Sequence, residues 1–296
     1  MALVKRFLAS GFGLMLLAAF VFSLADILTK YLTSQLSIMQ IAFIRFLLGG
    51  IILWPILFSR RSSLKGTHTW ILILRGLFGT FSFFCLLKSI TMLPLSNAIV
   101  LFYTFPLFVA LFSFLLFRTS IEKGELLLIG VGLLGIYILI NPDFHSFNTG
   151  YIFGILSSGV GGMAMVLIHK ARQTNGPLII YFYFCLMGGI LSFPFFIKEF
   201  RAPDFHHGIL LVSLGLMLLV GQILMNQAFK FCKASEGSLI MMSEIVFAGI
   251  AGFLMFKDPL TFHFLIGAFL IIGSGVGLNL MSRKSRHSPI PLNPEG

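Results

Sequence analysis

Ten apolar stretches of about twenty residues each fill most of this 296-residue chain. A helix of that length is long enough to cross the hydrocarbon core of a bilayer. It also bonds its own backbone N–H and C=O groups, which lipid cannot do for it. The sequence therefore predicts an all-α membrane protein with ten transmembrane helices. The predicted spans are residues 11–31, 38–58, 70–90, 95–117, 125–140, 150–168, 177–197, 208–230, 235–256 and 262–281.

The composition agrees with this class. Apolar residues make up 57% of the chain and charged residues 10%, whereas a soluble domain has about 25% charged residues. A single water-soluble core of this size could not hide so much apolar surface. The net charge of +11 does not indicate nucleic-acid binding, because the basic residues are spread between the apolar spans.

The basic residues predict an orientation. With a cytoplasmic N-terminus, fourteen Lys and Arg residues fall in inner segments and five in outer ones. This bias predicts a multi-pass protein with both termini in the cytoplasm, and makes residues 282–296 a basic, proline-containing cytoplasmic tail. We expect the membrane to be the inner (plasma) membrane. The first span follows Lys5 and Arg6 and also resembles a cleavable signal peptide. We expect it to be retained, because its apolar run is long and the internal repeat requires it.

The chain repeats itself at an offset of 139 residues. Residues 43–55 and 182–194 are identical at six of thirteen positions, and the same offset aligns 114–121 with 253–260. The repeat unit holds five spans, and an odd number inserts the second unit upside down. The predicted architecture is therefore two inverted five-helix repeats, at residues 10–140 and 149–281. Below, two residues related by this offset are called repeat-equivalent.

The two five-helix units, Arg45 in the second span, and segments 74–117 and 215–256 resemble the drug/metabolite transporter superfamily, specifically its EamA-domain members. The resemblance covers about residues 10–281. It implies a secondary transporter that moves a small organic metabolite by alternating access. It also implies a cavity lined by spans one, three, four, six, eight and nine. The cargo it implies is an S-adenosylmethionine-like metabolite, an amino acid or a nucleobase.

Charged residues within the spans are the first functional candidates, since each costs about 2.5–3.5 kcal/mol at a span centre. Glu244 lies mid-way along the ninth span, where its carboxyl group either carries a coupling proton or cation, or bonds to another helix. Asp26 and Arg45 lie at similar depth in the first two spans. They can pair, as a structural contact or as a gate. Proton coupling is a hypothesis that rests on Glu244 and Asp26.

Other polar residues extend the set. Arg75 near the inner end of the third span either reaches the headgroups or holds a carboxylate or phosphate of the cargo. Gln222 and Asn226 share one helix face, for cargo recognition or for helix packing. Tyr103 lies beside Pro106, which bends the fourth span. The candidate substrate or coupling residues are Glu244, Asp26, Arg45, Asn226, Gln222, Tyr103 and Arg75.

The sequence carries no Walker, Rossmann, HExxH or GxSxG motif, which argues against a common enzyme and against a nucleotide cofactor. The three scattered cysteines favour packing over a metal site. A membrane-embedded enzyme stays a minor alternative, and an uncoupled facilitator or channel a stronger one. Gly273 and Gly277 mark either a homodimer face or a contact within the monomer. The expected partners are therefore a small-molecule substrate and the lipid bilayer.

Overall fold

A computed structural model describes residues 10–33, 35–59, 65–93, 95–118, 122–142, 149–256 and 261–287. Every regular element in these ranges is a helix, and ten spans within them are long and apolar enough to cross a membrane. The helices are α2 (Gly11–Leu32), α3 (Ile38–Ser59), α4 (Thr69–Met92), α5 (Leu95–Phe102), α6 (Phe105–Phe117), α7 (Lys123–Ile140), α8 (Thr149–Ala171), α9 (Pro177–Glu199), α10 (Phe205–Ala228), α11 (Ala234–Met241), α12 (Ser243–Phe256) and α13 (Phe262–His287).

The predicted all-α fold with ten spans is confirmed, with two differences in detail. The fourth and ninth spans are each two helices, α5 with α6 and α11 with α12. Helix α13 runs on to His287. Residues 143–148 of the predicted linker and 288–296 of the predicted tail lie outside the described residues.

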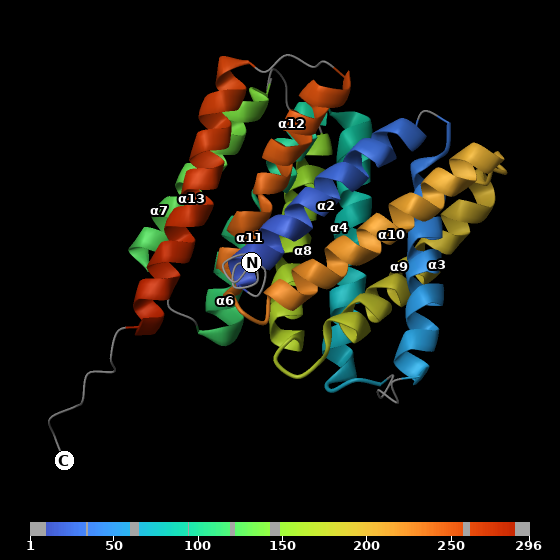
Figure 1. The fold of residues 1–296 in the computed structure, drawn as a ribbon, viewed down its shortest axis with the longest axis horizontal. Coiled ribbons are helices and arrows are strands. Elements are labelled where there is room, and N and C mark those ends of the chain that lie inside the picture. The colour runs from blue at the N-terminus through green and yellow to red at the C-terminus, as the bar shows by residue number, and fades with distance from the viewer. Residues whose placement is uncertain are drawn as a thin grey trace, which may run out of the picture.

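The helices form a bundle with two paired edges (Figure 1). Helices α3 and α9 pack together at one edge, and α7 and α13 at the other. Between them, α4 packs on α8 and α2 packs on α10. These contacts are themselves repeat-equivalent, because α4 and α10 are the third spans of their units, and α2 and α8 the first. Gly277 of α13 lies against Leu128 of α7, whereas a side chain at Gly273 would meet nothing within 4 Å.

Individual residue contacts are repeat-equivalent as well. Gly76 on α4 faces Met187 on α9, and Gly215 on α10 faces Leu48 on α3. Gly215 is the repeat equivalent of Gly76, and Leu48 that of Met187. When residue i contacts residue j and their equivalents make the reciprocal contact, a two-fold axis relates the two surfaces. The two units are therefore related by a pseudo-two-fold axis that passes between them.

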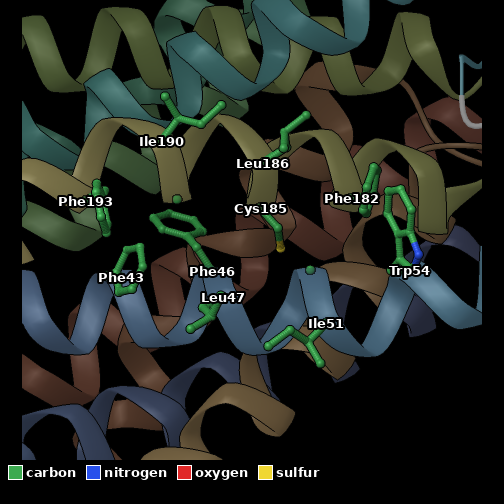
Figure 2. A pocket seen from close by; sticks show the side chains of 12 residues that line it. Phe43, Phe46, Leu47, Ile51, Trp54, Phe182, Cys185, Leu186, Ile190 and Phe193 are labelled. Carbon is green, nitrogen blue, oxygen red and sulfur yellow. The ribbon is translucent and has the colours of Figure 1, made fainter.

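The second spans show the reversed direction of the two units. Phe43 of α3 packs against Phe193 of α9, with 5.6 Å between ring centroids, and the ring centroids of Trp54 and Phe182 lie 6.0 Å apart. Figure 2 shows these pairs at opposite ends of the α3–α9 contact. The start of α3 thus lies beside the end of α9, so repeat-equivalent helices run antiparallel. Inversion of the second unit follows directly.

The two broken spans are interrupted at repeat-equivalent positions, Tyr103 and Met242. In the first unit, Pro106 lies in the first turn of α6 and has no N–H to donate to the preceding turn. In the second unit the equivalent residue is Ile245. There the Ser243 hydroxyl donates to the backbone oxygen of Ile240, a local bond that competes with regular helix.

Candidate functional site

Two carboxyl groups from opposite units meet where α2 packs on α12. Asp26 on α2 and Glu244 in the first turn of α12 are joined by a side-chain hydrogen bond. An ionised carboxylate has no proton to donate, so this bond requires one shared proton. The pair therefore carries at most one negative charge. Tyr103, buried at the break of the fourth span, is close enough to feel the charge of both acids.

The break in the ninth span places Glu244 favourably. It puts Glu244 in the first turn of the half-helix α12, where free N–H groups and the helix dipole favour negative charge. The Asp26 side chain keeps exposed surface although it bonds to a residue of another helix, and Glu244 is half-buried.

Arg75 on α4 is buried, with 3% of its surface exposed. Its Nη2 donates to Gln222 Oε1 of α10 over 3.2 Å, and its Cζ lies 3.9 Å from the ring centroid of Phe184 on α9. Its Nε and Nη1 have no protein acceptor. Gly79 lies one helical turn further along α4, and a side chain there would collide with Nη1.

Arg45 on α3 is held in a similar way. Its Cζ lies 4.3 Å from the ring centroid of Phe83 and 4.6 Å from that of Phe46, and its Nε is buried without an acceptor. Arg45 is within electrostatic range of both Asp26 and Arg75. Within the described part of the chain no salt bridge joins Arg45 to Asp26. The structure thus pairs Asp26 with Glu244 rather than with Arg45.

The structure separates two residues that the helical spacing grouped together. Gln222 contacts Arg75, but Asn226 one turn away is fully buried and Nδ2 donates to the backbone oxygen of Pro177 over 3.2 Å. The backbone oxygen of Asn226 accepts from Arg172 Nε over 2.9 Å. Asn226 therefore joins α10 to the turn between α8 and α9, and it lies outside the central group. The other six sequence candidates form the central group: the acid pair, the two arginines, and Tyr103 and Gln222, which interact with them.

Two residues of the site on α9 went unrecognised in the sequence. Tyr181 and Cys185 are buried, hydrogen-bonded to each other, and within electrostatic range of both Arg45 and Arg75. The sequence analysis treated the cysteines as packing residues. The repeat contained a signal: Cys185 is the repeat equivalent of Phe46, the direct neighbour of Arg45.

An apolar groove of about 660 Å³ lies between α3 and α9, beside this site (Figure 2). All twelve of its lining residues form six repeat-equivalent pairs, so the pseudo-two-fold axis passes through it. These pairs are Phe43 and Phe182, Phe46 and Cys185, Leu47 and Leu186, Gly50 and Gly189, Ile51 and Ile190, and Trp54 and Phe193. With no polar group besides a thiol and an indole N–H, this groove suits hydrocarbon, while Phe46 and Cys185 also contact the charged site.

A more polar cavity of about 300 Å³ lies between the two units at the face where α8 ends and α11 begins. Its lining includes Ser113 and Glu125 from the first unit, and Lys170, Gln173 and Lys233 from the second unit. The bundle is therefore hollowed between its units at this face.

Comparison with known proteins agrees with the fold. The EamA-like transporter family matches residues 9–141 and 148–280. A pseudopaline exporter of Pseudomonas aeruginosa is 26% identical over 279 residues, which cover 94% of this chain and 98% of that protein. An S-adenosylmethionine uptake transporter of Rickettsia prowazekii is 24% identical over 283 residues, 94% of this chain and 95% of that protein.

More distant proteins share the architecture. Human solute carrier family 35 member G1 is 23% identical over 296 residues, which cover 92% of this chain and 80% of that protein. A solved crystal structure superposes with a TM-score of 0.77 at 17% identity, covering 93% of this chain and 97% of that one. With both repeat units matched and named relatives that are transporters, this chain belongs to the EamA-like transporter family and is a multi-pass membrane transporter of small metabolites.

Proposed function

We propose that this protein is a proton-coupled secondary transporter that carries an organic solute unchanged across the inner membrane by alternating access of its two units. The observation that carries the proposal is the meeting of two carboxyl groups, Asp26 of the first unit and Glu244 of the second, where α2 packs on α12. Because the pair bridges the units, motion of one unit against the other acts directly on the proton-holding bond.

The geometry gives a physical route for coupling. When the units separate at the acid pair, the bond between Asp26 and Glu244 breaks and the shared proton can leave. Arg45 is within electrostatic range of Asp26 and stabilises the carboxylate that remains. Protonation then favours one arrangement of the units and deprotonation the other, which is the differential interaction that a population shift requires. The inverted repeat supplies two related end states.

The cargo of this chain belongs to this proposal as well. The relatives' names concern pseudopaline and S-adenosylmethionine, and both are small metabolites. We take an S-adenosylmethionine-like metabolite or an amino acid as the first cargo to test, and both termini as cytoplasmic. Import and export follow from the same mechanism with opposite gradients.

Proteoliposomes loaded with a pH-sensitive dye test the coupling. Labelled S-adenosylmethionine and a labelled amino-acid mixture are added with and without an inward proton gradient. We expect gradient-driven cargo movement in the native protein, and in Glu244→Gln a loss of the gradient's effect while counterflow of labelled cargo persists. Glu199→Gln, an exposed acid at the end of α9, is the control. A Glu244→Gln protein that still responds fully to the gradient contradicts proton coupling there, and flux without saturation or counterflow indicates a channel.

A further inference from the structure

We propose that the cargo carries a carboxylate and that Arg45 and Arg75 bind it on the axis between the two units. This inference rests on the proposed function, in which the central site holds the cargo. It specifies the chemical class of the cargo, an organic acid with one negatively charged group at the site, and it assigns the two ligating residues.

The first argument is the count of unsatisfied donors. Arg75 Nε and Nη1 and Arg45 Nε are buried N–H groups without a protein acceptor. A buried donor of a charged group that stays unpaired is costly, and native proteins pair nearly all such groups. Three such donors on two neighbouring guanidinium groups indicate an acceptor with several oxygen atoms, supplied by a molecule that enters the site.

The second argument is that the guanidinium groups are held in place. Phe184 and Gln222 position Arg75, Phe83 supports the face of Arg45, and Gly79 leaves room for Arg75 Nη1. A ring against the face of a guanidinium leaves its N–H edges free for in-plane bonds. That planar fork matches the two oxygens of a carboxylate or of a phosphate.

The third argument is charge, and it separates these two anions. The two guanidinium groups contribute two positive charges, and the acid pair holding one proton contributes one negative charge. The group then has one net positive charge beside the buried Arg75. One carboxylate neutralises it, whereas a phosphate dianion would leave the site negative. The pseudo-two-fold axis also relates the surroundings of the two arginines. Phe184 and Gln222, which hold Arg75, are the repeat equivalents of Arg45 and of Phe83, its ring partner.

Binding to the purified full-length protein in detergent tests this proposal without transport. Thermal-shift assays would use the common L-amino acids with their methyl esters, S-adenosylmethionine with its decarboxylated form, nucleobases, and nucleoside 5′-monophosphates. We expect the stabilising compounds to bear a free carboxylate, and the ester or decarboxylated partner to lose most of the shift. Preferential stabilisation by the monophosphates would show that the site takes phosphate. Equal stabilisation by compounds that lack a carboxylate, such as the methyl esters, decarboxylated S-adenosylmethionine or the nucleobases, or stabilisation by none of the acids, overturns the proposal.

Variants identify the ligating groups. We expect Arg75→Gln and Arg45→Gln each to weaken binding of the best acid about tenfold to one-hundredfold, the usual range for a lost charged hydrogen bond. Gly79→Ala keeps every charge but displaces Arg75 Nη1, so it weakens binding as well. Lys88→Gln removes an exposed cation from the same helix and is expected to bind normally. Binding of the acid that is unchanged in both arginine variants overturns the assignment, with folding checked by the ligand-free melting curve.

The binding result and the proton-coupling result can be distinguished in one variant. In Glu244→Gln the amide can donate to Asp26, so the acid pair keeps its single negative charge and carboxylate binding is expected to persist. Loss of the gradient's effect in that variant with normal acid binding supports both proposals. Normal coupling combined with binding that ignores both arginines rejects the carboxylate site alone.

Discussion

Asp26 and Glu244 share a hydrogen bond although they lie in the first span of one repeat unit and the fourth span of the other. The reciprocal acid pair does not exist, because the repeat equivalents of Asp26 and Glu244 are Met165 and Phe105. The two units have one fold, but their charged residues are distributed differently. The acid pair is therefore a property of the interface between the units.

Because the two acids hold one proton together, their substitutions should not add. Asp26→Asn and Glu244→Gln each replace the proton-bearing carboxyl with an amide that cannot release a proton. We expect each to abolish the response of uptake to a proton gradient, and the double variant to be no worse than either, as for residues that act as a unit. The measurement is initial uptake with and without the gradient. Independent, additive losses would mean that the acids work separately.

The α3–α9 contact predicts that alanine substitution destabilises the protein at one glycine and not at its neighbour. A side chain at Gly49 would come within 2.6 Å of Cys185 Sγ, whereas one at Gly50 would meet nothing within 4 Å. We expect Gly49→Ala to destabilise the protein by about 1–3 kcal/mol through overpacking, and Gly50→Ala to be neutral. Thermal unfolding in detergent measures both.

The second unit provides a matched control for this pair. Gly188 would bring a side chain within 2.6 Å of the Phe46 ring, and Gly189 faces open space. Gly188→Ala should therefore resemble Gly49→Ala, and Gly189→Ala should resemble Gly50→Ala. Equal losses at all four positions would contradict the pseudo-two-fold packing.

Gln222 and Asn226 should separate in function although they lie one helical turn apart. Asn226→Ala removes the bond to the Pro177 oxygen and leaves that acceptor unpaired, so we expect a loss of about 1–3 kcal/mol of stability with unchanged acid affinity. Gln222→Ala frees the Arg75 guanidinium and should lower acid affinity with a smaller effect on stability. The two readouts are the ligand-free melting temperature and the ligand-induced shift. The reverse pattern would place Asn226 in the site.

The start of α10 has a defined pH dependence. Asp204 caps this helix by accepting from the backbone N–H of His207 over 2.7 Å, and this bond together with the His207 ring holds the pKa of the Asp204 carboxyl below its usual range. A carboxyl with a lowered folded-state pKa stabilises at neutral pH, and its contribution is lost as pH falls through that pKa. We expect the protection factors of the amides at the start of α10, which account for the intrinsic pH dependence of exchange, to fall at acidic pH. In Asp204→Asn, which caps without titrating, this fall should be absent.

The orientation of the chain has a direct test. Reporter fusions in the second and fourth loops of the first unit, within segments 58–69 and 118–124, should lie on the cytoplasmic face with both termini. A reporter in segment 141–150 should lie on the opposite face. Termini found on different faces, or all three segments found on one face, would contradict the ten-span inverted arrangement.

The limits of the sequence are clearest at individual residues. Pro106 indicated an irregular fourth span, but the equivalent break at Met242 has no proline and is not readable from composition. Counting residues from the span ends placed Asp26 and Arg45 at one depth, yet depth does not fix the rotation of a helix. Rotation decided that Asp26 faces Glu244. Similarly, a shared helix face grouped Gln222 with Asn226, while different neighbouring helices pack against each.

The sequence by itself determined the number of spans, their approximate ends, the duplication and hence the inversion, because hydrophobic length and an odd repeat are local or countable properties. It also supplied six of the residues that surround the central site, since charge inside a span is rare. Only the tertiary structure decided their partners: the acid pair, the arginines against Phe83 and Phe184, and the contribution of Tyr181 and Cys185. These contacts depend on how two inverted units rotate and pack against each other, which no single stretch of sequence encodes.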